Sequence, residues 1–264
     1  MKTERGARGN QRRTGCGVGL LLCMVLIGAC HGPSRANLTV SAAASLKDAL
    51  AEAEAEYRQG HPDIEFSNNF ASSGTLAGQI LEGAPVDVFL SAAVKPMDDL
   101  EQKGEIVTGT RRNLLRNSLV LIAPLESKLQ DFPGLAGKSV RMIALGDPGS
   151  VPAGQYGQQT LAALHLLDKV KEKLVLGRDV RQVLTYVETG NADAGLVYAT
   201  DALTSRKIRV VAPAPERAHD PIVYPAAVVK GSGNEAAARK FIDFLAGPAA
   251  QAVFEKHGFT PAAP

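Results

Sequence analysis

The sequence predicts an α/β protein built of two units, each a mostly parallel sheet flanked by helices. Three observations carry this prediction. Short apolar or alternating segments typical of strands are separated by helix-forming segments along most of the chain. The length of 264 residues fits two α/β units. The contents of 45% hydrophobic and 21% charged residues are typical of a globular chain and argue against disorder.

The first 29 residues form a separate segment with the layout of a secretory signal peptide. Five basic residues precede an apolar run over 17–27, which is too short for a membrane-spanning helix. The run ends in small residues before Cys30, a pattern that resembles the lipobox of bacterial lipoproteins. We therefore predict a signal peptide over 1–29, lipidation of Cys30 and a polar tether over 30–36. The alternative is an ordinary signal peptide in which Cys30 is incidental.

The segment after the tether alternates between strands and helices. Ser45 stands at an N-cap position before a stretch rich in strong helix formers, and Gly60 and Pro62 end that helix. The next strand alternates apolar and polar residues, and a turn of small residues leads into the following helix. We expect strands at 37–41, 64–70 and 86–90 and helices at 46–57, 76–81 and 97–103.

A second series of strands and helices follows, and the chain then closes with two helices. The segment 117–123 is apolar throughout and ends at Pro124, which indicates a buried strand. A loop rich in turn formers comes after the next strand. We expect strands at 117–123, 140–145, 194–197, 208–211 and 222–229 and helices at 155–164, 180–189, 235–245 and 248–256.

Charge and cysteine content exclude several classes of function. The leader holds five basic residues and one acid, so its removal leaves 24 basic and 26 acidic residues. The exported chain is therefore near −2 in charge and lacks the basic patch expected of a nucleic-acid binder. Cys16 and Cys23 are removed with the leader, and Cys30 alone permits neither an internal disulfide nor a cysteine-based metal site.

Three strand-to-helix turns are made of small residues, at Ala42–Ser45, Ala71–Gly74 and Val151–Gly154. Ligands of open α/β sheets bind at the carboxyl ends of strands, where such turns lie. Free N–H groups of a first helical turn point toward a ligand there, and the helix dipole favours negative charge. Three such turns that converge on one cleft would hold an anion without any charged side chain. The alternative for each turn is that its serine only caps a helix.

Five motifs spread in order over residues 37–260 resemble those of the periplasmic molybdate-binding proteins of ABC importers. This resemblance implies the type II periplasmic-binding-protein fold, in which two α/β lobes joined by two crossing segments close on a ligand. We expect the first lobe at 37–120 plus 224–264 and the second at 121–223. The motifs are AAASL at 42–46, FASSGTL at 70–76, GAPVDVF at 83–89, GDPGSVPAG at 146–154 and GLVYATDA at 195–202.

The resemblance further implies that a tetrahedral dianion, molybdate or tungstate, is held by neutral hydrogen-bond donors. It implies delivery to an ABC transporter permease from the periplasm, where Cys30 would anchor the protein to the membrane. We expect a monomer without a cofactor and without a metal site other than the oxyanion. Gly74 departs from the pattern, because many relatives carry another serine there. The implied ligand-binding residues are Ser45, Ser73, Ala153, Val180 and Tyr198.

Two other functions compete with this interpretation. A receptor for sulfate or another oxyanion would share the fold, and an amino-acid receptor would place an arginine against its ligand. We interpret Arg181 and Arg206 as solvated instead, and we assign Asp147 and Asp201 to capping and turn roles. A serine hydrolase is the remote alternative: Ser73 does not lie in a Gly-x-Ser-x-Gly elbow, and no two histidines have metal-ligand spacing on a helix. We therefore expect no enzyme.

Overall fold

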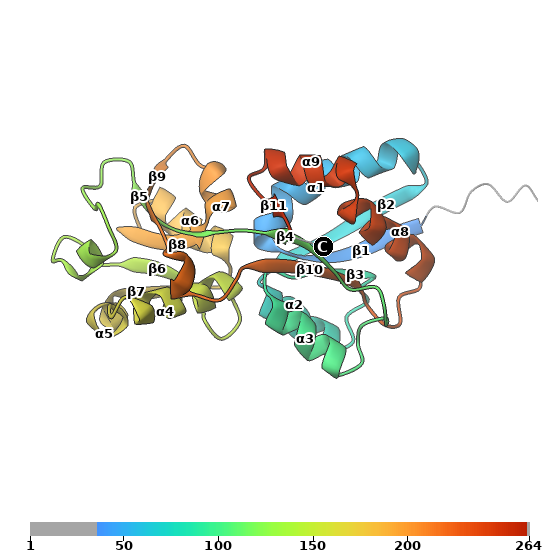
Figure 1. Cartoon of the computed structure of the whole chain (residues 1–264), viewed down its shortest axis with the longest axis horizontal. Helices are drawn as coiled ribbons and strands as arrows, with labels where there is room; N and C mark the ends of the chain where they lie inside the picture. The colour runs from blue at the N-terminus through green and yellow to red at the C-terminus, as the bar shows by residue number, and fades with distance from the viewer. Residues whose placement is uncertain (1–35, 263–264) are drawn as a thin grey trace, which may run out of the picture. The chain divides into compact units, whose positions relative to one another are not determined.

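The computed structural model describes residues 36–262. Within this range the chain forms two sheets flanked by helices, which confirms the predicted α/β class (Figure 1). The predicted signal peptide, Cys30 and the tether up to residue 35 lie outside the described residues. Residue 36, the last of the predicted tether, is already the first residue of a strand.

The first lobe is a six-stranded sheet with the strand order β11-β4-β10-β3-β1-β2. The central strand β1 pairs in parallel with β2 and β3, and β10 is antiparallel to β3 and β4. In Figure 1, α1, α8 and α9 cover one face of this sheet, and α2 and α3 cover the other. The strands are β1 (Ala36–Ala43), β2 (Ile64–Ala71), β3 (Val88–Leu90), β4 (Arg112–Arg116), β10 (Val223–Val228) and β11 (Thr260–Pro261). The helices are α1 (Lys47–Gly60), preceded by the 3-10 turn η1 (Ala44–Leu46), α2 (Ser73–Leu81), α3 (Val94–Gln102), α8 (Glu235–Ala246) and α9 (Pro248–Lys256).

The second lobe is a five-stranded sheet with the order β7-β6-β8-β5-β9. Its strand β6 is parallel to β7 and β8, whereas β5 is antiparallel to β8 and β9. The strands are β5 (Leu119–Pro124), β6 (Ile143–Gly146), β7 (Leu174–Gly177), β8 (Ala194–Tyr198) and β9 (Ile208–Pro213). The helices are α4 (Pro152–Ala163), α5 (Leu167–Val170), α6 (Val180–Glu188) and α7 (Ala199–Leu203), and the 3-10 turns are η2 (Pro133–Ala136), η3 (Lys171–Lys173) and η4 (Glu216–Ala218).

The chain passes between the two sheets twice. The first crossing lies between Arg116 and Leu119, where β4 of the six-stranded sheet leads into β5 of the five-stranded sheet. The second lies between Pro213 and Val223, where β9 leads back into β10 (Figure 1). These two segments are the crossings that a two-lobed binding protein requires. The residue boundaries of the lobes given above stay a prediction.

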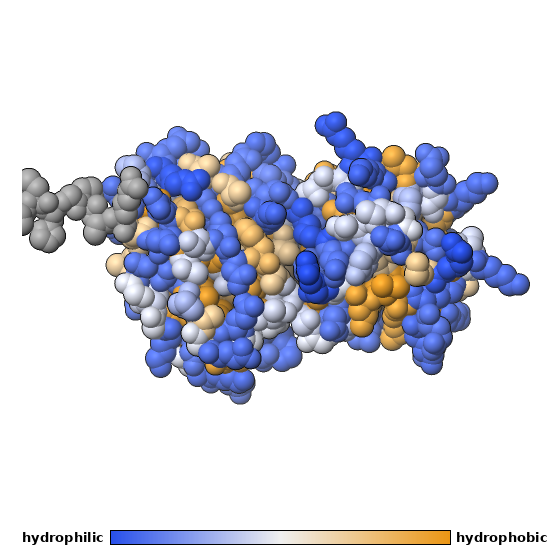
Figure 2. Space-filling model, turned by 180° about the vertical axis from the view of Figure 1, so that it is seen from behind, coloured by the Kyte–Doolittle hydropathy of each residue, from blue (hydrophilic) through white to orange (hydrophobic). Residues whose placement is uncertain are grey.

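The apolar side chains that the sequence places on strands and helices form the core. Leu38, Val40, Val88 and Leu119 are fully buried, as alternation and apolar runs predict. Figure 2 shows one face of the molecule, where polar residues cover most of the surface and apolar residues are exposed in separate groups. Among residues 36–262, no helix combines the length and the apolar character needed to cross a bilayer.

One local prediction is wrong and affects the site. Ser45 does not cap a helix, because it lies inside η1, and neither η1 nor α1 has a side-chain cap bond. The tight turn between β1 and α1 directs its hydroxyl to Tyr224 instead, with 3.0 Å between the two oxygens.

Candidate ligand-binding site

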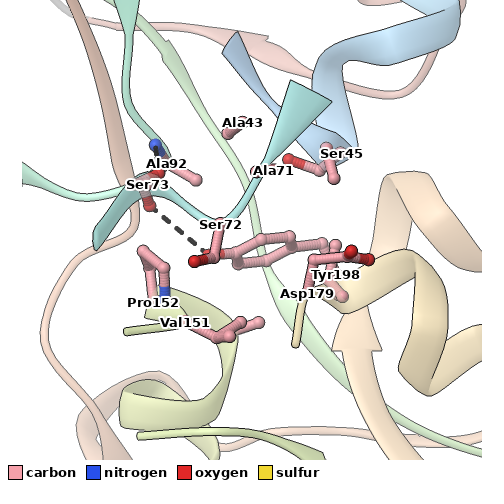
Figure 3. A pocket seen from close by; sticks show the side chains of 13 residues that line it. Ala43, Ser45, Ala71, Ser72, Ser73, Ala92, Val151, Pro152, Asp179 and Tyr198 are labelled. Atoms are coloured by element: carbon pink, nitrogen blue, oxygen red, sulfur yellow. Dashed lines mark hydrogen bonds between the residues drawn. The ribbon is translucent and has the colours of Figure 1, made fainter. Parts of the chain in front are cut away.

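A pocket lies where the carboxyl ends of β1, β2 and β8 meet the starts of helices from both lobes (Figure 3). Its position follows the rule for open α/β sheets, in which ligands bind beyond the carboxyl ends of strands. All five residues implied by the resemblance line it. Their role as ligand donors stays a prediction. The lining residues are Ala43, Ala44, Ser45, Ala71, Ser72, Ser73, Ala92, Val151, Pro152, Ala153, Asp179, Val180 and Tyr198.

Three helices begin at this pocket: α2 at Ser73, α4 at Pro152 and α6 at Val180. The N–H groups of a first helical turn have no partner within the helix, and the helix dipole adds positive potential. The lining holds no lysine, arginine or histidine, and its one charged residue is Asp179. The Asp179 carboxylate caps α6 by accepting the Gln182 N–H at 2.9 Å. The pocket therefore favours an anion through dipoles and neutral donors.

Glycine allows α4 to start this close to the sheet. A Cβ on Gly154 would lie 1.9 Å from the carbonyl oxygen of Gly146, the last residue of β6. Any larger residue at 154 would push the helix start away from the strand end. The Pro-Ala-Gly sequence thus brings Ala153 to the pocket, with Pro152 in the first turn, where its missing N–H costs nothing.

Ser72 and Ser73 have different partners although they are neighbours. Ser72 is the N-cap of α2: its hydroxyl accepts the Thr75 N–H at 3.3 Å and lies 2.8 Å from the Thr75 hydroxyl. Ser73 is fully buried, and its Oγ accepts the Ala92 N–H at 2.8 Å. Because a backbone N–H only donates, the Ser73 hydroxyl keeps its own proton free for an acceptor in the pocket.

Tyr198 ends β8, and its ring spans the pocket (Figure 3). Its hydroxyl donates to the Ala92 carbonyl oxygen at 3.4 Å, a bond that joins the two lobes. Burial raises the pKa of Tyr198 well above its usual value, so the phenol stays neutral and able to donate. A neutral donor of this kind suits an anionic ligand.

One expectation about the charged residues beside the pocket is wrong, and another is incomplete. Arg181 is not solvated: its Nε lies 2.6 Å from Oδ1 of Asp201, and its Nη2 lies 2.7 Å from Oδ2 of Asp48. Asp201 lies in the first turn of α7, where a capping role was expected, but it is also fully buried against this guanidinium, which was not expected. Burial raises the pKa of Asp201 to about 6, although the Arg181 charge opposes that rise. The partners are far apart in sequence, so local patterns gave no signal of the pair.

The other assignments of charged residues agree with the structure. Arg206 is exposed, as expected. Asp147 has its turn role, because its Oδ1 accepts the Gly149 N–H at 2.9 Å. No histidine lies in the pocket lining. Among the described residues no group of three His, Cys, Asp or Glu side chains is arranged to hold a metal ion.

Sequence reasoning missed two polar residues behind the site. Tyr224, in β10, contacts the Ser45 hydroxyl, and the Asn117 amide donates to the Tyr224 hydroxyl at 3.2 Å. Neither residue belongs to a motif of small residues or lines the pocket. The chain separates Ser45 from Tyr224 by 179 positions, so only the fold reveals the contact.

Two α/β lobes with a ligand pocket between them define a solute-binding protein of the periplasmic type. Residues 38–260 match the family described as bacterial extracellular solute-binding protein, and the chain belongs to this family. The predicted recognition and the expected absence of enzymatic activity are thereby confirmed, because the relatives below are binding proteins of transport systems rather than hydrolases.

Three similar proteins illustrate the relationship. The chain is 46% identical over 228 residues to YvgL of Bacillus subtilis, whose name assigns it provisionally to the ABC transporter substrate-binding lipoproteins; the match covers 86% of this chain and 87% of that protein. It is 43% identical over 230 residues to the molybdate-binding protein ModA of Haemophilus influenzae, with 85% and 90% covered. The solved periplasmic molybdate-binding protein of Azotobacter vinelandii is 28% identical, with a TM-score of 0.77, and the match covers 86% of this chain and 99% of that structure.

Proposed function

We propose that this protein captures molybdate, and also tungstate, in the pocket between its lobes and delivers it to the permease of an ABC importer. The observation that carries the proposal is the convergence of Ser45, Ser73, Ala153, Val180 and Tyr198 on one pocket without a cationic side chain. The names of the relatives support the same ligand and the same kind of transporter.

The donor set fits a tetrahedral dianion. Ser45 and Ser73 offer hydroxyl protons, and Ala153 and Val180 offer N–H groups in the first turns of their helices. Tyr198 would offer its proton by exchanging its long bond to the Ala92 carbonyl oxygen, at 3.4 Å, for a bond to the ligand. A buried dianion needs a hydrogen bond to each oxygen, and each charge-assisted bond contributes about 1.5–3 kcal/mol. Neutral donors also avoid a salt pair with the ligand, which would slow its release to the transporter.

Both lobes contribute to this donor set, so ligand binding would hold them together. Contacts between the lobes already lie beside the pocket. The Gly74 N–H donates to the Ser150 carbonyl oxygen at 3.0 Å, and Arg181 of the second lobe pairs with Asp48 of the first. Closure of two lobes around a ligand is the hinge motion typical of binding proteins.

Oxyanion competition in a calorimeter tests the proposed ligand. The purified protein is titrated with molybdate, tungstate and sulfate, each alone and in the presence of the others. We expect molybdate and tungstate to bind at one shared site and sulfate to compete weakly, because the resemblance implies a cage sized for the larger tetrahedra. Preferential binding of sulfate would assign the site to another oxyanion and overturn the proposal.

We further propose that the mature protein is a monomer held at the periplasmic face of the membrane by a lipid on Cys30. The lipobox-like sequence and the lipoprotein name of the Bacillus subtilis relative support the anchor. Cys30→Ala should release the exported protein into the soluble fraction, whereas Cys23→Ala, in the leader, should leave it with the membrane. A wild-type protein that is soluble after export would contradict the anchor.

A further inference from the structure

We propose that Asn117 and Tyr224 form a hydrogen-bond relay that directs the Ser45 hydroxyl proton toward the bound oxyanion. The inference rests on the proposed function, because it explains how one donor of that pocket is positioned. Neither Asn117 nor Tyr224 lines the pocket. Both are therefore positioning residues that act through Ser45.

The relay begins at Asn117, whose amide orientation is fixed. The Ser118 N–H, which only donates, bonds to Oδ1 of Asn117 at 2.9 Å. The amide nitrogen consequently faces the Thr200 hydroxyl at 2.9 Å and the Tyr224 hydroxyl at 3.2 Å. A side-chain NH₂ group donates and does not accept. The Tyr224 oxygen must therefore accept from Asn117.

Tyr224 passes this direction on to Ser45. Its side chain is 2% exposed, and burial raises its pKa well above the usual value, so the hydroxyl keeps its proton. Among the described residues, two oxygens face this proton: Oγ of Ser45, at 3.0 Å, and the hydroxyl of Tyr198, which also interacts with Tyr224. If Ser45 donated to Tyr224 instead, the Tyr224 proton would lose its acceptor at 3.0 Å and keep only the contact with the Tyr198 hydroxyl, which itself donates to the Ala92 carbonyl oxygen. The Tyr224 hydroxyl therefore donates and Ser45 accepts.

Ser45 is then left with one proton and a pocket in front of it. It is 3% exposed, lines the pocket, and has Tyr224 as its side-chain partner. The hydroxyl of Ser73 is oriented in the same way by a single hydrogen bond, because its oxygen accepts the Ala92 N–H. Two serines of one pocket thus each receive a hydrogen bond from behind, which leaves each free to donate forward to an anion.

The relay also connects Ser45 to both crossings between the lobes. Asn117 lies between β4 and β5, Tyr224 lies near the start of β10, and Thr200 belongs to α7 of the second lobe. The direction of one ligand donor is consequently set where the chain passes from one sheet to the other.

A double-mutant cycle tests the relay. Tyr224→Phe removes the hydroxyl but retains the ring that packs against Tyr198 and Phe259. Molybdate affinity is measured by calorimetry for the wild type, Tyr224→Phe, Ser45→Ala and the double variant. Loss of one hydrogen bond predicts a weakening of about 2- to 12-fold for Tyr224→Phe. In the Ser45→Ala background the same change should have no further effect.

Two further variants separate the relay from a general loss of polarity. Tyr57→Phe removes the hydroxyl of a buried tyrosine that packs against Phe66 and Phe241 and lies outside the pocket lining, and its affinity should equal that of the wild type. Asn117→Asp replaces the obligate donor by an acceptor, so Tyr224 would donate backward and Ser45 would lose its free proton. Asn117→Asp should therefore weaken binding more when Ser45 is present than in the Ser45→Ala background, where only the added charge acts.

The outcomes distinguish the relay from the proposed function. Equal losses for Tyr224→Phe in both backgrounds, or wild-type affinity in Tyr224→Phe, would overturn the relay while molybdate binding stands. If the wild type binds sulfate in place of molybdate, the proposed ligand is wrong, and the same cycle run with sulfate decides the relay. If Tyr224→Phe does not fold, as judged by thermal unfolding, the Asn117→Asp comparison decides it. A wild type that binds no oxyanion refutes both.

Discussion

Replacement of Ser73 by alanine removes a hydroxyl that the structure uses twice. The Ser73 oxygen accepts the Ala92 N–H at 2.8 Å, and its proton is free to bond to an oxyanion. Loss of a charge-assisted bond costs about 1.5–3 kcal/mol, which corresponds to a drop in affinity of about 10- to 150-fold. Because Ala92 also lines the pocket, its freed N–H can turn to the ligand and offset part of this cost. We therefore expect a loss near 10-fold.

Ser72→Ala is the matched comparison, since it removes the same group one position earlier. The Ser72 hydroxyl caps α2 through Thr75, so its loss should reduce the free energy of unfolding by about 0.5–2 kcal/mol. Molybdate affinity should hardly change, because the Ser72 oxygen caps the helix and the Thr75 hydroxyl, 2.8 Å away, can take its proton. Ser72→Ala should therefore change stability with little effect on binding, whereas Ser73→Ala should weaken binding.

Calorimetric titration with molybdate and urea unfolding of both variants measure the two quantities. Ser73→Ala also leaves a buried N–H without its acceptor, so it too should be less stable than the wild type. Binding alone therefore decides between the two roles. A greater loss of affinity in Ser72→Ala than in Ser73→Ala would show that the donor at this turn is the wrong serine, and the assignment of Ser73 would fail.

Three other properties follow from the structure. A Cβ on Gly74 would lie 2.6 Å from the Ser150 carbonyl oxygen, so Gly74→Ala should weaken molybdate binding in calorimetry, whereas Gly78→Ala in the same helix meets nothing within 4 Å and should bind normally. Burial raises the pKa of Asp201 from 3.8 to about 6. The folded chain then keeps a proton that the unfolded chain has lost, so the free energy of unfolding should fall as the pH rises from about 4 to 6, and fall less in Asp201→Asn; urea titrations at several pH values measure this. Small-angle scattering should show a smaller radius of gyration with molybdate, and an unchanged radius at saturation would contradict closure.

The sequence predicted the fold well where periodicity is strong, and less well where strands are short. The helices at 235–246 and 248–256 lie within a residue of their expected bounds, because apolar stripes and Gly247-Pro248 define them. The strands β4, β7 and β11 were missed. They are five, four and two residues long. At such lengths pairing with a neighbouring strand, rather than local propensity, decides the conformation.

The candidate site was predicted by motif rather than by physics alone. Small residues at strand-to-helix turns indicated an anion pocket, and the family resemblance selected the individual residues. Ser45 shows where this reasoning ends: its N-cap role followed from local spacing and was wrong, because a tyrosine from β10 takes its hydroxyl. Hydrogen bonds between side chains far apart in sequence depend on the whole fold, and a single sequence does not display them.

Arg181 explains how a pocket for a dianion can stand beside an arginine and still lack a cationic donor. The residue follows Val180 at the start of α6, so its guanidinium is one position from the pocket lining. Asp201 pairs with Nε of that guanidinium at 2.6 Å, and Asp48 pairs with Nη2 at 2.7 Å. A buried cation that is already paired with two carboxylates contributes little attraction to a third anion. The attraction for an anion in the pocket consequently comes from helix starts and hydroxyl groups. The strength of their hydrogen bonds depends on where each N–H or O–H points. For this reason the orientation of a single serine proton, which we propose is set through Tyr224 and Asn117, should have a measurable effect on affinity.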